Sequence, residues 1–157
     1  MKIRIQTLWR IPVFCMVSGL ICFYLTVYLG RFFFAVKTVG DDGSIQASVD
    51  PVRAAIFHAV LFLIVLFVGG FWVVRSMTKT EAAVSAGIAS GIYLLIVFVQ
   101  LIAPDIPPSL NILFAYIQEW KSALSSILMR LTDSLAMSAI ISSFAPLLFI
   151  LFGRAEK

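Results

Sequence analysis

The residues that could support acid–base or metal chemistry are few in this sequence and lie far apart. His58 is the only histidine, and no carboxylate follows or precedes it within one helical turn. A histidine beside a carboxylate could relay protons or sense pH. An isolated one near a membrane interface has no such partner. We therefore treat His58 as an interfacial residue and assign no catalytic residue, no metal ligand and no cofactor.

The two cysteines, Cys15 and Cys22, lie in the first apolar segment and are seven positions apart (22 − 15). On a helix this spacing separates them by about 10 Å, beyond the roughly 7 Å limit for a disulfide. A thiol hydrolase would need a cysteine next to a histidine and an acid, and the spacing gives that arrangement no support. We interpret both cysteines as small packing residues.

The whole chain is too apolar for a soluble domain. Of its 157 residues, 61% are hydrophobic and 13% are charged, whereas soluble domains have about 25% charged residues. The net charge of +4 comes from basic residues at the ends of apolar segments, not from a basic cluster with interleaved aromatics. The composition therefore predicts a protein of the lipid bilayer that binds no nucleic acid.

Four apolar segments are long enough to cross a bilayer, since about 20 helical residues span 30 Å. We expect transmembrane helices over residues 11–31, 51–75, 79–103 and 133–153. Asp50 and Pro51 form a helix start, and Thr78 with Glu81 forms a capping-box pattern. The first segment follows a basic stretch, as a signal peptide does, but no small-residue cleavage site precedes Arg31. We expect it to remain as a helix.

Two polar regions connect these helices. Residues 37–49 form a polar loop with a turn at 40–43, flanked by weakly strand-like residues that favour a small β-hairpin. Apolar residues recur every three or four positions over residues 109–131, which predicts an amphipathic helix. Its charged residues argue against a span, so we expect it at the interface, against either lipid or protein.

Small residues four positions apart mark two helix faces. In lipid, such faces let a neighbouring helix approach closely. The predicted helix-packing residues are Ala83, Gly87 and Gly91 on the third helix and Ser134, Ser138 and Ser142 on the fourth. These faces predict close packing of the third and fourth helices, and Pro146 predicts a kink in the fourth.

A polar path across the membrane has weaker support. Ionisable residues inside a membrane are a usual sign of function, and the sequence places none between the ends of the four predicted spans. The candidate residues for such a path are His58, Gln100 and Ser138. Serines on spanning helices more often bond to backbone or pack against a neighbour, so we favour packing for Ser138.

Charge distribution predicts the orientation. With four spans and an inner N-terminus, seven of the 12 Lys and Arg residues fall in the shorter, inner segments. These are Lys2, Arg4, Arg10, Arg75, Lys79, Arg154 and Lys157. The positive-inside rule then places both termini in the cytoplasm of a multi-pass protein of the cell membrane.

The sequence therefore predicts an all-α integral membrane protein, with four transmembrane helices in a bundle and one amphipathic interfacial helix between the third and fourth. We favour a non-enzymatic accessory, assembly or regulatory subunit that acts through helix contacts with another membrane protein or a second copy. The alternative is a small transporter or channel formed by oligomerisation. An enzyme is less favoured, for want of a nucleophile–base pair.

Overall fold

The computed structural model describes residues 5–39, 45–103 and 105–155. Four of its helical segments are long and apolar enough to cross a membrane, which makes the chain a multi-pass membrane protein. These segments are Gln6–Phe33, Pro51–Val74, Lys79–Ile102 and Leu135–Phe152.

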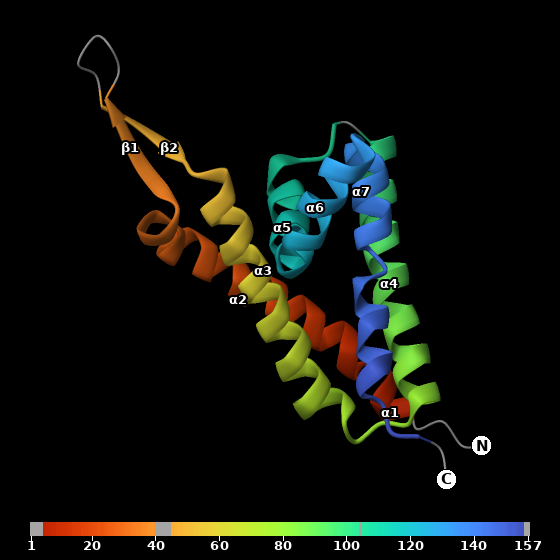
Figure 1. The fold of residues 1–157 in the computed structure, drawn as a ribbon. Coiled ribbons are helices and arrows are strands. Elements are labelled where there is room, and N and C mark those ends of the chain that lie inside the picture. Colours follow the sequence, from red (N-terminus) through yellow and green to blue (C-terminus); the bar gives the residue numbers. More distant parts are fainter. Residues whose placement is uncertain (1–4, 40–44, 104, 156–157) are drawn as a thin grey trace.

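A β-hairpin connects the first two spans and projects beyond them (Figure 1). The first span comprises α1 (Ile5–Leu8) and α2 (Arg10–Phe33). Strands β1 (Ala35–Val39) and β2 (Ile45–Val49) pair antiparallel, with Ala35 opposite Val49. The predicted hairpin is confirmed over these strands. The predicted turn at 40–43 lies outside the described residues.

The second and third spans begin where their capping residues predict. The Asp50 side chain accepts hydrogen bonds from the backbone N–H groups of Val52 and Arg53, and α3 (Pro51–Val68) follows. A π-helical turn, η1 (Gly69–Val74), completes that span. Thr78 and Glu81 exchange side-chain-to-backbone hydrogen bonds at the start of α4 (Lys79–Ile102). The capping box is confirmed because it depends only on nearby residues.

One end of the molecule gathers three segments that lie far apart in the sequence (Figure 1). Arg10 donates a hydrogen bond to Ser76 in the turn between α3 and α4. Arg154 bonds through its backbone to Met77 and Lys79. The start of the first span and the end of the fourth therefore lie on the same side as the α3–α4 turn.

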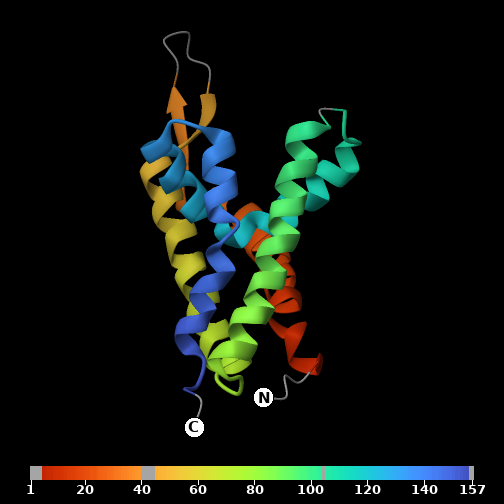
Figure 2. The ribbon, with the colours of Figure 1, turned by 90° about the vertical axis from the view of Figure 1, so that its right-hand side faces the viewer.

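The prediction of one amphipathic helix between the third and fourth spans is wrong. This segment is not one continuous helix over residues 109–131. It consists of α5 (Pro108–Gln118), a 3₁₀ turn η2 (Glu119–Lys121) and α6 (Ser122–Thr132). The chain descends between the spans with α5, turns at η2 and rises with α6 (Figures 1 and 2). We call the whole segment, residues 108–132, the re-entrant hairpin.

The fourth span is also interrupted. Helix α7 (Leu135–Ser142) ends before Pro146, and a tighter 3₁₀ segment, η3 (Ala145–Phe152), continues to the end of the span. The predicted kink is thus a break of the α-helix just before the proline, which removes one backbone donor. The described backbone has one non-glycine residue with positive φ, Asp133 (φ 53°), which ends α6 in a left-handed conformation.

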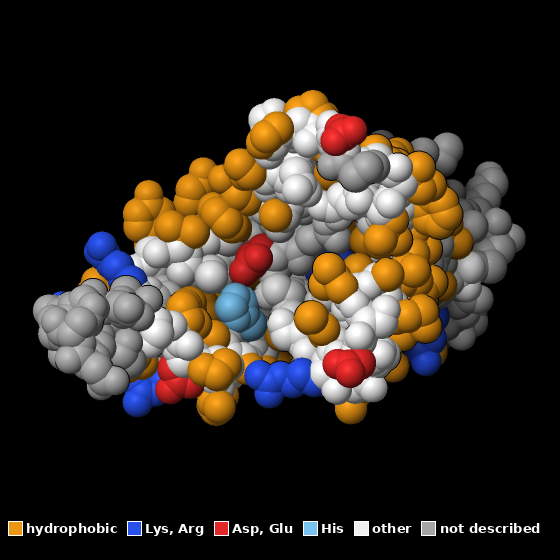
Figure 3. All heavy atoms as spheres, turned by 90° about the horizontal axis from the view of Figure 1, so that it is seen from above, with side chains coloured by type: hydrophobic (Ala, Val, Ile, Leu, Met, Phe, Trp, Pro, Cys, Tyr) orange, Lys and Arg blue, Asp and Glu red, His pale blue; other side chains and the backbone are white. Residues whose placement is uncertain are grey.

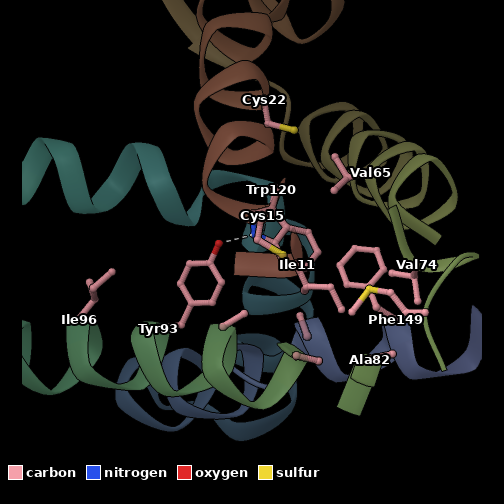
Figure 4. Close-up of a cluster of buried hydrophobic side chains, with 14 residues drawn as sticks. Ile11, Cys15, Cys22, Val65, Val74, Ala82, Tyr93, Ile96, Trp120 and Phe149 are labelled. Atoms are coloured by element: carbon pink, nitrogen blue, oxygen red, sulfur yellow. Dashed lines mark hydrogen bonds between the residues drawn. The ribbon is translucent and has the colours of Figure 1, made fainter. Parts of the chain in front are cut away.

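The largest buried side chains lie between α2, α4, η2 and η3 (Figure 4). Trp120, Tyr93 and Phe149 are almost fully buried there, together with Ile11 and Cys15. Phe62 of α3 stacks on Trp120, with ring centroids 5.7 Å apart. Both cysteines are free and buried. The core of the molecule therefore forms around a residue of the re-entrant hairpin.

Candidate functional site

The η2 turn lies at mid-height between the spanning helices. Its neighbours Gly19, Phe62 and Ser142 each lie near the centre of their own span. A helical segment that enters a membrane without crossing it must bury its backbone in protein or line a water-filled cavity. The charged residues of η2, Glu119 and Lys121, therefore reach a depth at which the sequence had predicted no ionisable residue.

Gly19 permits this insertion. A Cβ atom at Gly19 would collide with the backbone carbonyl of Ile117, at the end of α5. Backbone atoms cannot rotate out of the way, so only glycine allows the hairpin to pack this closely against α2.

A hydrogen-bond chain holds the turn in place. Trp120 Nε1 donates to Tyr93 Oη at 2.8 Å (Figure 4). This hydroxyl donates to the backbone oxygen of Ile117 at 3.3 Å. Both buried side chains thereby satisfy their polar atoms. The chain links α4 to the end of α5 and to the middle residue of the turn, between Glu119 and Lys121.

Lys121 is buried without a carboxylate partner. Only 3% of its surface is exposed. Its Nζ donates to Ser142 Oγ at 3.1 Å and lies 5.5 Å from the centroid of the Tyr93 ring. Among the described residues, no acid lies within ion-pair distance of this ammonium. Burial lowers the pKa of Lys121 to about 8, so it remains mostly protonated at neutral pH.

Glu119 points to the other side of the turn and pairs with His58. Its Oε1 lies 3.2 Å from His58 Nε2 and accepts a hydrogen bond from Thr26 at 3.2 Å. His58 Nδ1 lies 2.7 Å from the carbonyl of Ala54, which can only accept, so Nδ1 carries a proton. A second proton must lie between Nε2 and Oε1. The two side chains therefore form a hydrogen-bonded ion pair when His58 is protonated.

This pair is accessible from the end of the molecule that carries the β-hairpin. In Figure 3, the histidine lies beside an acidic side chain near the middle of that face, below the surrounding elements. The side chains of His58 and Glu119 are 21% and 19% exposed. The pair is therefore within reach of molecules on that side.

Polar residues continue from the tip toward the same end. Gln118 donates to Gln100 Oε1 at 3.2 Å, and Gln100 donates to Asn111 at 2.9 Å. Two residues of the predicted polar path, His58 and Gln100, thus contact adjacent residues of the re-entrant hairpin, although they come from α3 and α4. Ser138, the third, lies one helical turn before Ser142, the partner of Lys121.

The serines of the fourth span have different environments. Ser134 caps α7 by accepting from the backbone N–H of Met137. Ser138 and Ser142 are fully buried and donate to carbonyls of their own helix, Leu135 and Ala139. The hydroxyl of Ser142 also accepts from Lys121, so it is part of the site.

The small-residue face of α4 does not pack against the described parts of the chain. Gly87 and Gly91 are exposed, and an added Cβ would meet nothing within 4 Å at either position. Ala83 is partly buried. The helix instead packs against η3 through the neighbouring face, which includes Ala82 and Ala86. The third and fourth spans are thus neighbours, but not through the glycines.

Sequence reasoning missed Glu119, Lys121 and Tyr93 as members of a site. The sequence carries no local signal for the turn, because the apolar period of residues 109–131 runs through Glu119–Lys121 without interruption. The described residues contain no group of three or more His, Cys, Asp or Glu side chains placed to bind a metal.

Comparisons of the chain with protein-family models, with curated proteins and with solved structures find no match.

Proposed function

We propose that this chain is a small transporter or channel that moves a small polar or ionic solute past the tip of the re-entrant hairpin. The observation that carries the proposal is the placement of two charged residues, the partly buried Glu119 and the buried Lys121, at mid-height among four apolar spans. Charges at that depth are costly and are usually retained for transport or proton relay. We further propose that both termini face the cytoplasm, so that the β-hairpin end faces outward.

Two details support transport over a purely structural role for these charges. The polar residues lie where helices are interrupted, at η2 and at the break between α7 and η3, as in transporters that bind substrates at discontinuous helices. The His58–Glu119 pair is also open toward one end of the molecule and not sealed in the interior. A buried structural ion pair needs neither feature.

An efflux experiment with a mixed load tests the proposal for many solutes at once. Proteoliposomes are loaded with a mixture of isotope-labelled amino acids, carboxylates, amines and sugars, and with a pH-sensitive dye. We expect at least one solute, or protons, to leave wild-type vesicles about tenfold faster than Glu119→Gln or Lys121→Met vesicles. Asp105→Asn, an exposed acid, is the control and should match the wild type. Equal retention by wild-type and protein-free vesicles would contradict transport.

An accessory subunit is the second candidate, supported by the open face at Gly87 and Gly91. Such a face lets a helix of another chain approach closely. Gly87→Leu with Gly91→Leu should then abolish co-purification of a stoichiometric partner from native membranes. Val27→Leu, at an exposed position of α2, is the control. An unchanged complex in the double variant would count against this role.

A further inference from the structure

A pocket of about 300 Å³ lies between the two arms of the re-entrant hairpin and α7. Its floor is formed by the tip, where Gln118, Glu119, Lys121 and Ser122 line it. Its walls rise with α5, α6 and α7 and include the apolar side chains of Ala115, Met129, Leu135 and Ala139. The pocket thus has a charged floor and mainly apolar walls, and its volume is roughly ten times that of a water molecule in the liquid.

Two residues that line the floor, Lys121 and Glu119, carry opposite charges that do not pair with each other. Lys121 Nζ makes one hydrogen bond, to Ser142, and so retains donors without an acceptor among the described residues. Glu119 uses Oε1 for His58 and Thr26, while no hydrogen bond within the described structure involves its Oε2. Opposite charges at the same depth would ordinarily stabilise one another directly.

Ser122 adds a further unsatisfied group. Its Oγ is buried and has no hydrogen-bond partner among the described residues. Buried hydroxyls almost always have a partner, from the protein or from a bound molecule. Three residues that line one pocket, Lys121, Glu119 and Ser122, therefore carry polar atoms with bonding capacity left among the described residues.

We propose that this pocket binds a small zwitterion of the amino-acid type. Lys121 and Ser122 bind the carboxylate of the ligand, Glu119 binds its ammonium, and the apolar walls hold a short aliphatic side chain. A simple anion is less well matched because it would lie beside Glu119, and a simple cation would lie beside Lys121. The inference rests on the proposed function in that it names the class of transported solute.

Three matched probes test it: L-valine, isovalerate, which lacks the amino group, and isobutylamine, which lacks the carboxylate. Equilibrium binding is measured on the purified full-length chain in detergent, so the result does not depend on transport. We expect L-valine to bind at least about tenfold more tightly than either half-molecule, because each charge-assisted contact contributes about that factor.

Variants assign each charge to its half of the ligand. Lys121→Met should weaken L-valine about tenfold or more and leave isobutylamine unchanged, whereas Glu119→Gln should weaken L-valine and leave isovalerate unchanged. Ser122→Ala, which removes the unsatisfied hydroxyl and is less disruptive to folding, should weaken L-valine and isovalerate about equally. Arg130→Gln and Asp105→Asn remove exposed charges of the same signs and should bind as the wild type does.

Several results would overturn the zwitterion assignment. Isovalerate binding as tightly as L-valine would make the pocket an anion site. Binding of L-valine that is absent, or unchanged in folded Lys121→Met and Ser122→Ala, would remove the pocket from consideration. An anionic lipid that co-purifies with the wild type and is not displaced by L-valine would identify a lipid site. If L-valine binds but no solute leaves the vesicles, the zwitterion site is supported and only the proposed transport function is contradicted.

Discussion

Burial of the Lys121 ammonium destabilises the folded protein and at the same time supplies a positive charge to the proposed site. In the folded protein, the Ser142 hydroxyl and the face of the Tyr93 ring replace the water around this ammonium. Burial lowers its pKa from an ordinary value of 10.5 to about 8. Replacing a buried, unpaired charge by an apolar side chain of similar size commonly stabilises a protein. Because this buried charge destabilises the fold, a role in binding explains Lys121 better than a role in folding does.

The pKa difference predicts a pH dependence with a definite sign. Between pH 8 and 10.5, an unfolded chain holds the Lys121 proton while the folded chain has released it. The free energy of unfolding therefore rises with pH across this window, by about 3 kcal/mol from this residue. Below pH 8 the full destabilisation is present. Lys121→Met should thus be more stable than the wild type at pH 7, and the difference should shrink toward pH 10.5.

Denaturant titrations of both proteins in detergent, at several pH values, measure this difference. Subtracting the variant's curve from the wild-type curve removes the titration of tyrosines and other lysines that both proteins share. Arg130→Gln, an exposed cation on α6, should show no such pH-dependent difference. Parallel curves for wild type and Lys121→Met would show that Lys121 is not buried as a cation.

At the scale of elements, the position of the re-entrant hairpin depends on Gly19. A methyl group there would collide with the carbonyl of Ile117. Gly19→Ala should therefore lower the free energy of unfolding by about 1–3 kcal/mol, the usual cost of overpacking. It should also displace the hairpin, which the near-ultraviolet signal of buried Trp120 would report.

Gly91→Ala is the matched control because it makes the same change in the middle of another spanning helix. Nothing lies within 4 Å of its added Cβ. Alanine is the better helix former by about 1 kcal/mol, so this variant should be neutral or slightly stabilised. If Gly19→Ala and Gly91→Ala changed the free energy of unfolding equally, the close approach at Gly19 would not determine how the re-entrant hairpin packs on α2.

Elements that depend on nearby residues could be predicted from the sequence. Asp50 with Pro51, and Thr78 with Glu81, define helix starts because their hydrogen bonds reach only three residues along the chain. The four spans follow from length and apolarity alone. The hairpin strands follow from a turn signal between alternating residues.

The turn at Glu119–Lys121 could not be predicted in the same way. The apolar period of residues 109–131 is that of one amphipathic helix, and nothing local interrupts it. Its interruption depends on Tyr93, Gly19 and Ser142, which come from three different spans. The same non-local contacts bring Lys121 into the interior, whereas its charge alone predicts an exposed position.

At the scale of the whole molecule, the two ends differ in what they expose. One end carries the α3–α4 turn and the chain segments near both termini. The opposite end carries the β-hairpin and the opening toward His58 and Glu119 (Figures 1 and 3). If the first end is cytoplasmic, as the basic residues predict, the opening at the His58–Glu119 pair faces the outer side.

Labelling of introduced cysteines tests this orientation. Ser48 on β2 and Ala155 near the end of the chain are exposed, small residues at opposite ends of the molecule. An impermeant maleimide added to intact cells should label Ser48→Cys and should label Ala155→Cys only after the membrane is opened. The unmodified chain is the control, because Cys15 and Cys22 are 0% and 2% exposed and should stay unlabelled. The reverse pattern would place the His58–Glu119 pair toward the cytoplasm, and labelling of both variants from one side would contradict four spans.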